Sequence, residues 1–327
     1  METIVKDCIY RYITIPQLCQ QFVDTPEFQR LRRIKQLGIA HYVYPSAVHT
    51  RFEHSLGVMH LAGQAVDNIV RNAEITVSTR QKELIMLAGL LHDVGHMAYS
   101  HMFDKVAGEV QGLANEHEHR AIAFLEAMNK RKGNILTTEE EMCVGCMIIG
   151  TIPDNEPKWM YQIINNKLCD VDVDKMDYLQ RDAYHTGIPG FQPDYIIRQM
   201  TTDDNGNLAF KHKAYTDVES IFVTRKRMFA NVYYHKTTTK VDAIYRGTIK
   251  DAINRLNPQR IIFHFEDDFQ AETYLRKEYP QIFELLDLRN LNAALAKGNF
   301  TINKQRQASY VSGCNNLDTV IGRIIFV

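Results

Sequence analysis

The chain has 327 residues, of which 45% are hydrophobic and 24% are charged. A chain of this size and composition can bury the core of one sizeable domain with an added lobe, which excludes an intrinsically disordered protein. Its formal net charge of -1 provides no overall positive field for nucleic acid or for an anionic membrane. Nucleic acid is therefore an unexpected partner, and a small phosphate ligand at a local basic site is favoured.

Helix signals dominate most of the chain. Thr25 followed by Pro26 is a cap residue before a favoured first helical residue, so a helix is predicted from there to Gly38. The run Thr79–Leu91 is apolar on nearly all sides in its second half, which is typical of a helix that enters the core. This helix is expected to carry the sequence HDVGH, residues 92–96, into the interior.

Later elements are predicted from the same kinds of signal. Thr138 with Glu141 has the pattern of a capping box at a helix start. The turn residues from Asp203 to Asn207 precede an alternating stretch and predict a short β-hairpin. Further helices are expected over residues 158–168, 172–185 and 218–252.

The end of the chain is predicted to form a separate lobe. Arg260–Phe265 and Arg323–Val327 have the composition of strands. No internal repeat or linker divides the rest. The predicted fold class is therefore mainly α, with a helical core over residues 1–257 that includes the short β-hairpin. A small α+β lobe over residues 258–327 is expected to pack on this core.

Six cysteines are present in a chain long enough to fold without disulfides, and no secretory signal precedes them. We therefore expect an intracellular protein, cytoplasmic or nuclear. The longest apolar runs, such as Leu84–Leu91, are well short of the roughly 20 residues of a membrane-spanning helix. No membrane partner is expected. One CxxC pair, Cys143 and Cys146, is better explained by small buried residues than by zinc or redox chemistry.

Histidines are concentrated in one part of the chain, because nine of the 13 lie within residues 41–119. Among them, His92 and Asp93 follow the predicted buried helix, where an unpaired carboxylate loses several kcal/mol of solvation. A divalent cation removes this cost. Imidazole with carboxylate suits Mn, Fe, Zn or, with more oxygen ligands, Mg.

The best candidates for two further ligands are His54 and Asp174, in predicted helices. One such histidine alone would be better explained as a core residue bonded to a backbone carbonyl. Together with His92 and Asp93, however, they form a pattern that resembles the HD phosphohydrolase superfamily. The resemblance implies a metal-binding, helical HD-domain core.

Longer stretches also match, namely DTPEFQRLRRIKQLG (24–38), HTRFEHSLGV (49–58), LLHDVGHMAYSHMFD (90–104), EHEHRA (116–121) and DVDKMDYLQRDAYHTGI (172–188). They resemble the deoxynucleoside triphosphate (dNTP) triphosphohydrolases, and in particular the catalytic core of the sterile-alpha-motif and HD-domain enzymes. Beyond Asn257 only the general architecture still resembles these enzymes. The resemblance as a whole implies that a dNTP is cut between its 5′ oxygen and the α-phosphorus, which releases triphosphate and a deoxynucleoside.

Protonation of the leaving group in this reaction needs an acid. His101 and His117 are the candidates because imidazole gives and takes protons near neutrality, and which of the two donates stays open. Asp104 and Glu118 are placed to orient an imidazole, and His96 is expected to contact phosphate.

The triphosphate needs cations beyond the metal, and the family's motif places Arg51, Lys175 and Arg225 there with Tyr178 beside them. For Lys175 the alternative is an ion pair with Asp172 or with Asp177.

Sugar recognition, as the resemblance implies, falls to Gln36, Leu37, Asp182 and Tyr233. Gln36 and Asp182 would hold the 3′-hydroxyl, whereas Leu37 and the Tyr178 ring would leave no room for a 2′-hydroxyl. His185 is expected to line the same pocket. Without the family, Leu37 is simply an apolar residue that packs in the core.

A second nucleotide site is implied by four residues that match the family's contacts to an activating nucleotide, GTP or dNTP: Asp24, Gln29, Arg32 and Lys213. The alternative for Asp24 is a helix-dipole contact, and for Arg32 a solvated helix face. The resemblance also implies a homo-oligomer, a dimer or a tetramer.

Two other functions compete with this one. The first is an HD-domain phosphohydrolase that acts on a nucleoside monophosphate or a cyclic dinucleotide. The three cations Arg51, Lys175 and Arg225 argue against a monophosphate, which has less charge to neutralise. The second is a nucleotide or single-stranded nucleic-acid binding module with a degenerate site, although all four metal ligands are present here and the net charge is near zero.

Overall fold

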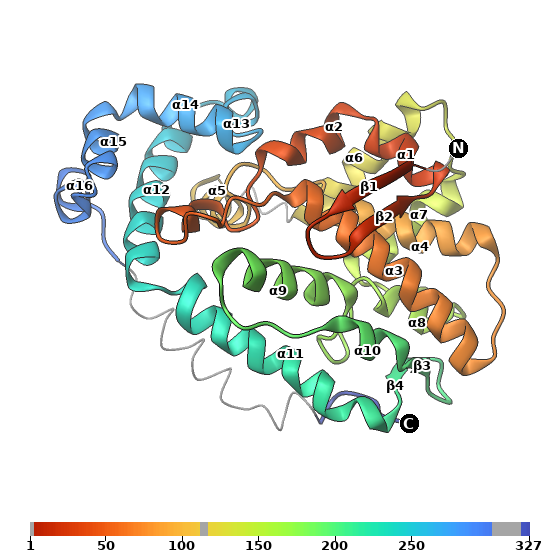
Figure 1. Ribbon diagram of the computed structural model, residues 1–327. Coiled ribbons are helices and arrows are strands. Elements are labelled where there is room, and N and C mark those ends of the chain that lie inside the picture. The colour runs from red at the N-terminus through yellow and green to blue at the C-terminus, as the bar shows by residue number, and fades with distance from the viewer. Residues whose placement is uncertain (1–2, 112–116, 303–321) are drawn as a thin grey trace.

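The computed structural model describes residues 3–111, 117–302 and 322–327. Its strands are β1 (Thr3–Asp7), β2 (Arg11–Ile15), β3 (Met200–Thr202) and β4 (Leu208–Phe210). Its first eight helices are α1 (Gln17–Val23), α2 (Pro26–Gln29), α3 (Arg51–Ala73), α4 (Thr79–Leu91), α5 (His101–Gln111), α6 (His117–Arg131), α7 (Thr138–Ile149) and α8 (Lys158–Gln162). The remaining helices are α9 (Val173–Thr186), α10 (Pro193–Arg198), α11 (Tyr215–Met228), α12 (Lys236–Arg255), α13 (Pro258–His264), α14 (Asp268–Glu278), α15 (Pro280–Asp287) and α16 (Leu291–Lys297). Helices dominate, so the mainly α fold class is confirmed (Figure 1).

Helix α3 is the central element, because α4 and α9 both pack against it (Figure 1). It begins with a capping box, in which the side chain of Thr50 accepts from the backbone N–H of Glu53 and the side chain of Glu53 accepts from the backbone N–H of Thr50. Gly57 makes the approach of α9 possible, since a Cβ atom there would lie 1.9 Å from Asp177 Oδ1. This contact brings the charged face of α9 against the middle of α3.

Helix α4 carries the predicted sequence into the interior, as expected. Ser78 and Gln81 form the capping box at its start, and the eight residues from Leu84 to Leu91 are buried. Gly89 lies close to the backbone of Val58 in α3. The chain leaves α4 at His92, deep in the protein.

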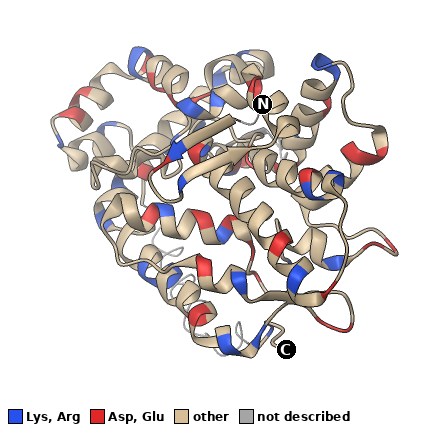
Figure 2. Ribbon diagram, turned by 45° about the vertical axis from the view of Figure 1, so that its right-hand side comes forward, with Lys and Arg blue, Asp and Glu red and all other residues tan. Residues whose placement is uncertain are grey.

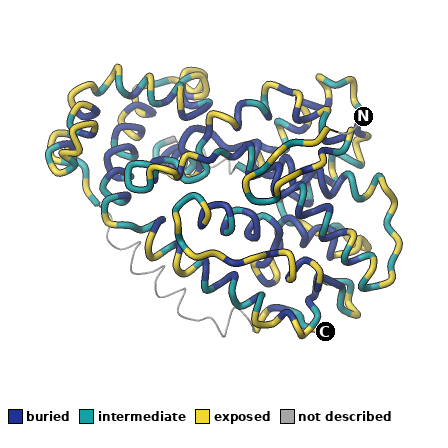
Figure 3. The backbone as a smooth tube through the Cα atoms, viewed as in Figure 1, coloured by how far each residue is buried: buried dark blue, intermediate teal, exposed yellow. Residues whose placement is uncertain are grey.

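Two clusters of buried apolar side chains hold these helices together. The larger contains residues of α1, α3, α4, α7 and α9. The smaller joins α5 and α12 to α13–α16. In Figure 3 the buried backbone accordingly runs through the middle of α3, α4 and α9, whereas the outer turns of α14–α16 are exposed. Whether residues 258–327 form a separate domain stays a prediction.

Two antiparallel hairpins complete the fold. The pair β3 and β4, with Met200 opposite Phe210, is the hairpin predicted from the turn at Asp203 to Asn207. The pair β1 and β2, with Asp7 opposite Arg11, has no counterpart in the sequence prediction. No helix in the described ranges is both long and apolar enough to cross a membrane.

The strands predicted for the C-terminal lobe are wrong. Residues 258–264 form α13, because Asn257 caps the backbone N–H of Arg260 and Pro258 occupies the first helical position. Only Ile261 and Phe265 are buried there, at the four-residue spacing of a helix. The described residues 322–327 instead pair with the core, where Phe326 lies opposite Phe210 of β4.

Several predicted helix bounds also need correction. The helix from Pro26 breaks at Ile34, where an extended backbone brings Lys35 opposite Thr50. The capping box of α7 is formed by Thr137 and Glu140, one residue earlier than predicted. The helix from Lys158 ends at Gln162, and residues 215–255 are divided by a π-helical turn at 229–233.

Candidate metal centre and active site

Four side chains from three helices converge at one point, and they are the four predicted metal ligands. We call this group the HD cage: His54 of α3, His92 and Asp93 at the end of α4, and Asp174 in the first turn of α9. His54 Nε2 lies 3.2 Å from His92 Nε2 and 3.0 Å from Asp174 Oδ1. His92 Nε2 lies 3.4 Å from Asp174 Oδ1 and 3.5 Å from Asp93 Oδ1. Ligands of one ion at about 2.1 Å from it are separated by about 3 Å, as these atoms are.

The far side of each imidazole in the HD cage is fixed by a hydrogen bond. His54 Nδ1 donates to Asp177 Oδ2 over 2.7 Å, and His92 Nδ1 donates to the carbonyl of Gly89 over 2.8 Å. These bonds leave both Nε2 atoms directed at the same carboxylates. Buried Nε2 atoms and carboxylate oxygens that face one another suit a cation between them, once the protons are lost, and a fixed Nδ1 is the usual arrangement of metal-bound histidine.

Asp177 was missed as a site residue, although it lies in the stretch that contains Asp174. It receives two hydrogen bonds from Arg181 and one, of 2.8 Å, from Tyr10. Burial disfavours its charge, but Arg181 and His54 outweigh burial and lower the pKa of Asp177 to about 2. A carboxylate that stays ionised at this position holds His54 in one orientation.

Protons compete for the HD cage. Burial opposes protonation of His54, yet the carboxylates of Asp174 and Asp177 raise its pKa to about 10. Burial likewise opposes ionisation of Asp174, but hydrogen bonds from His54 and His92 hold its pKa well below the usual range. A cation must displace the protons of such a cluster.

Arg51 lies directly beside the cage. Its guanidinium donates to Asp93 Oδ2 and, over 2.7 Å, to Ser100 Oγ. Arg51 is only 4% exposed. Its predicted contact with phosphate stays a prediction, and in this structure its partner is a cage carboxylate.

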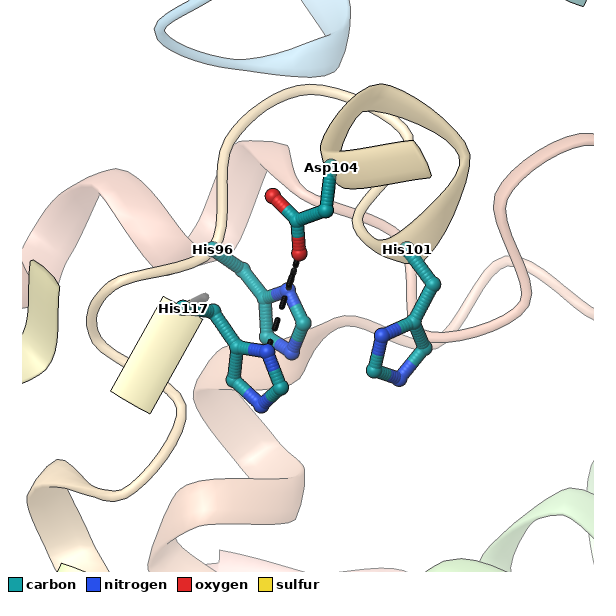
Figure 4. Close-up of side chains that lie close together, drawn as sticks. All are labelled: His96, His101, Asp104 and His117. Carbon is teal, nitrogen blue, oxygen red and sulfur yellow. Dashed lines mark ion pairs between the residues drawn. The ribbon is translucent and has the colours of Figure 1, made fainter. Parts of the chain in front are cut away.

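A second cluster next to the cage contains the predicted proton-transfer residues. Figure 4 shows the imidazoles of His96 and His117 stacked, with ring centres 3.8 Å apart, and His101 to the side. Asp104 Oδ2 lies 3.6 Å from His117 Nδ1 and 3.9 Å from His96 Nδ1. Glu118 lies 3.3 Å from His117 Nδ1. Both predicted carboxylates therefore face His117.

His96 connects the two clusters. Its Nε2 lies 3.2 Å from Asp93 Oδ1, and neither ring nitrogen makes a hydrogen bond with the described residues. Burial and the charges of Arg51 and His117 lower the pKa of His96 well below its usual value. The same three effects lower the pKa of His101 to about 4, although part of this side chain is open to solvent.

Arg120 is a second residue that the sequence prediction missed. It donates to Asp104 Oδ1 and, over 2.8 Å, to the carbonyl of Gly95. Burial disfavours the charge of Asp104, but His117 and Arg120 outweigh burial and lower its pKa. Arg120 thereby fixes the carboxylate that faces His117. Its place within the stretch EHEHRA was the available signal.

Two of the three cations expected to bind phosphate, Lys175 and Arg225, share one carboxylate. Lys175 Nζ lies 2.9 Å from Asp170 Oδ1 and 3.5 Å from Asp172 Oδ2, and Arg225 donates to Asp170 Oδ2. The alternative pairing of Lys175 with Asp172 is therefore present, whereas Asp177 is bonded to Arg181 and His54. Asp170, which the prediction did not include, is 53% exposed at its side chain.

The residues expected at the sugar are also brought together. Asp182 Oδ1 lies 2.7 Å from His49 Nε2, and Tyr233 donates to Asp182 Oδ2 over 2.7 Å. His185 stacks on His49 with ring centres 4.3 Å apart. The backbone N–H of Gln36 donates to the carbonyl of His49, and its buried Oε1 has no partner among the described residues. Leu37 and Tyr178 pack at the edge of the larger cluster. His49, the first residue of its matching stretch, was missed.

The four predicted effector residues lie in two places. Gln29 accepts a hydrogen bond from Arg32, whose guanidinium also lies over the ring of Phe52. Asp24 ends α1 and accepts from Gln20. Lys213 lies in the 3-10 turn His212–Ala214, which precedes α11. These contacts do not test an effector role, which stays a prediction.

Comparison with known proteins identifies two family regions. Residues 51–182 match the HD domain, and residues 193–305 match the HD associated region. The chain is 31% identical over 252 residues to the deoxynucleoside triphosphate triphosphohydrolase SAMHD1 homolog of Dictyostelium discoideum, covering 76% of this chain and 49% of the relative. It is 33% identical over 274 residues to human SAMHD1, covering 74% and 43%.

A viral protein is similar as well. The chain is 31% identical over 294 residues to the putative HD domain-containing protein L394 of Acanthamoeba polyphaga mimivirus, covering 85% of this chain and 63% of that protein. The chain thus spans about half the length of the curated relatives it matches. The HD cage lies within the matching regions, and the chain belongs to the HD-domain family, related to the SAMHD1-type triphosphohydrolases.

Proposed function

We propose that this protein is a metal-dependent phosphohydrolase that converts a dNTP to a deoxynucleoside and inorganic triphosphate. The observation that carries the proposal is the convergence of His54, His92, Asp93 and Asp174 on one point, with the guanidinium of Arg51 on Asp93. Two relatives at 31% and 33% identity are named deoxynucleoside triphosphate triphosphohydrolases. A divalent metal held by His54, His92, Asp93 and Asp174 would supply Lewis-acid chemistry, which acidifies water and stabilises negative charge on the α-phosphate.

The proton for the leaving 5′ oxygen comes, in this proposal, from His117 Nε2. Asp104 and Glu118 face Nδ1 of this ring, so they orient it and leave Nε2 for the substrate. Among the described residues, no carboxylate forms an ion pair with His101, and its lowered pKa of about 4 makes it neutral near pH 7. His96 holds phosphate through a ring that makes no hydrogen bond in the described part of the chain.

Lys175 and Arg225 bind the β- and γ-phosphates by exchanging Asp170 for the substrate. In the structure both cations contact this exposed carboxylate. A triphosphate carries several times the negative charge of the Asp170 carboxylate. Arg51 stays on Asp93 and helps to neutralise the α-phosphate at the cage.

Asp182 and Gln36 hold the 3′-hydroxyl in this proposal. His49 and Tyr233 already fix both oxygens of Asp182, so the carboxylate is positioned before the sugar arrives. Leu37 and Tyr178 form the apolar wall that excludes a 2′-hydroxyl. Activation by a guanine nucleotide at Asp24, Gln29 and Arg32 with Lys213, and assembly into a homo-oligomer, are part of the same proposal. So is an intracellular location, in keeping with five free cysteines in the described chain.

The deciding experiment incubates the purified protein with each dNTP and Mn²⁺ or Mg²⁺, with and without GTP, and separates the products by ion-pair chromatography. We expect deoxynucleoside and triphosphate in equal amounts. Products that contain only diphosphate or monophosphate would contradict the proposal and favour another nucleotide substrate. His92→Ala with Asp93→Ala should remove the activity, and light scattering in the same buffers reports assembly.

A further inference from the structure

A second group of metal-ligating side chains lies outside the HD cage. One ligand atom each from Cys8, Glu53 and His185 lies within 4.8 Å of the others. Cys8 Sγ is 3.7 Å from His185 Nε2. The three come from different elements: the turn between β1 and β2, the first turn of α3 and the last turn of α9. Cys8 is exposed and the others are partly buried, so the group is accessible to ions from solvent.

The turn that carries Cys8 is held against α9. Asp7 Oδ1 accepts from the backbone N–H groups of Ile9 and Tyr10 over 2.8 and 2.9 Å. Asp7 Oδ2 accepts from Arg181 Nη1 over 2.9 Å. Arg181 precedes His185 by four residues and so lies on the same face of α9. The ion pair therefore places Cys8 beside His185.

The other two side chains are fixed without using the atoms that would bind an ion. Glu53 Oε1 accepts from the backbone N–H of Thr50 over 2.7 Å, which leaves Oε2 for a ligand. The ring of His185 stacks on His49 at an interplanar angle of 11°, so its plane is set while Nε2 faces Cys8. The site is therefore preorganised. Because these side chains are already held in place, binding an ion costs little further conformational entropy.

We propose that Cys8, Glu53 and His185 form a second divalent-cation site, selective for a thiophilic ion such as Zn²⁺. Thiolate, imidazole and carboxylate are all zinc ligands, and three of them leave the fourth position of a tetrahedral site for water. When the ion binds, the Cys8 thiol releases its proton to the solvent. The HD cage contains no sulfur, so the two sites differ in the metals they prefer.

The local charges permit a cation there. Arg181 lies 4.0 Å from Cys8 Sγ, but its charge is matched by Asp7 and Asp177. An ion at this site ties the β1–β2 turn to α3 and α9. Through His185 and His49 it also stiffens the side of the pocket that contains Asp182. The site itself does not depend on the proposed reaction.

The test uses Co²⁺ as a spectroscopic substitute for Zn²⁺ on the full chain under anaerobic, reducing conditions. Thiolate bound to Co²⁺ gives a charge-transfer band in the near ultraviolet, which the sulfur-free HD cage cannot produce. We expect the band to appear on titration with Co²⁺ and to disappear when Zn²⁺ is added. Cys8→Ser should lose the band and bind one equivalent of Co²⁺ less than the unaltered chain.

Matched variants separate this site from others. Cys146→Ser alters a partly buried thiol on α7 and should keep the band. His92→Ala with Asp93→Ala should also keep it, because these changes affect the HD cage alone. Loss of the charge-transfer band in His185→Gln, with an unchanged circular dichroism spectrum, supports the ligand set. No band in the unaltered chain, or a band that survives Cys8→Ser, would overturn the proposal.

Discussion

His54 donates a hydrogen bond of 2.7 Å to Asp177, and the side chains of both residues are at most 1% exposed. The bond crosses the interface of α3 and α9 at the point where Gly57 lets the two helices approach. Asp177 is itself held by Arg181 and Tyr10. The orientation of His54, a proposed metal ligand, thus depends on a chain of buried polar contacts that reaches the N-terminal hairpin.

Asp177→Asn should weaken metal binding by roughly 10- to 100-fold, as changes to the outer partners of metal-bound histidines do. An amide can donate to His54 Nδ1 and so favour the tautomer that places a proton on Nε2, toward the metal. Isothermal titration with Mn²⁺ measures the effect. Asp154→Asn, at an exposed position, is the control. An unchanged affinity in a folded Asp177→Asn protein would show that this contact does not position His54.

His117→Gln should lower kcat for a dNTP by roughly 10²- to 10⁴-fold, the usual contribution of a positioned general acid. The loss should nearly vanish with p-nitrophenyl triphosphate, because its leaving group needs no proton. Comparison of the two substrates in stopped assays measures this difference. If His101→Gln rather than His117→Gln shows the substrate-dependent loss, the acid is His101.

Asp170→Asn should lower KM for a dNTP by about two- to fivefold, because ion pairs near the surface are worth roughly 0.5–1 kcal/mol. The substitution removes the carboxylate that Lys175 and Arg225 share in the free protein. Asn also tolerates the positive φ of 61° at this position. Initial rates at increasing substrate concentration give KM. A higher KM would mean that Asp170 helps to place the two cations.

Asp268 should make stability depend on pH. Burial raises the pKa of this carboxyl from 3.8 to about 6, although backbone N–H groups of Tyr99 and Lys35 partly offset the effect. The folded state therefore favours the neutral acid. Its contribution to stability is fully present below about pH 3.8 and is lost as the pH rises through about 6.

Urea unfolding between pH 4 and pH 7 measures this dependence. The free energy of unfolding of Asp268→Asn should lose a pH-dependent contribution of at most about 3 kcal/mol, the equivalent of the shift in pKa. Asp154→Asn should retain the full pH dependence. Parallel curves for the unaltered chain and for Asp268→Asn would contradict the assignment.

Locally encoded features were predictable from the sequence. The cap at Thr25 and the turn at Asp203 to Asn207 depend on residues within a few positions of one another, and both are confirmed. The strand prediction at Arg260–Phe265 failed because a short apolar run fits either structure, and the cap at Asn257 decides for a helix. The β1–β2 hairpin depends on distant contacts, such as Asp7 with Arg181.

The same distinction applies to the site. The HD cage could be predicted as a candidate metal centre because its side chains are of the types that bind metal and follow a recognisable order. The roles of Asp177, His49, Arg120 and Asp170 were missed, although the first three lie in the matching stretches, because these roles arise from contacts between segments that are distant in the sequence. Each has an ordinary alternative in sequence, as a solvated charge or a capping residue. The packing of α9 on α3 shows what Asp177 holds, and the packing of α6 beside the loop after α4 shows what Arg120 holds.

The most direct measurement is the position of the label after hydrolysis of a dNTP in water enriched in heavy oxygen. If the HD cage directs water to the α-phosphorus, mass spectrometry will find one heavy oxygen in the triphosphate and none in the deoxynucleoside. Label in the deoxynucleoside, or in diphosphate or monophosphate, would mean that water attacks elsewhere and would contradict the proposed reaction.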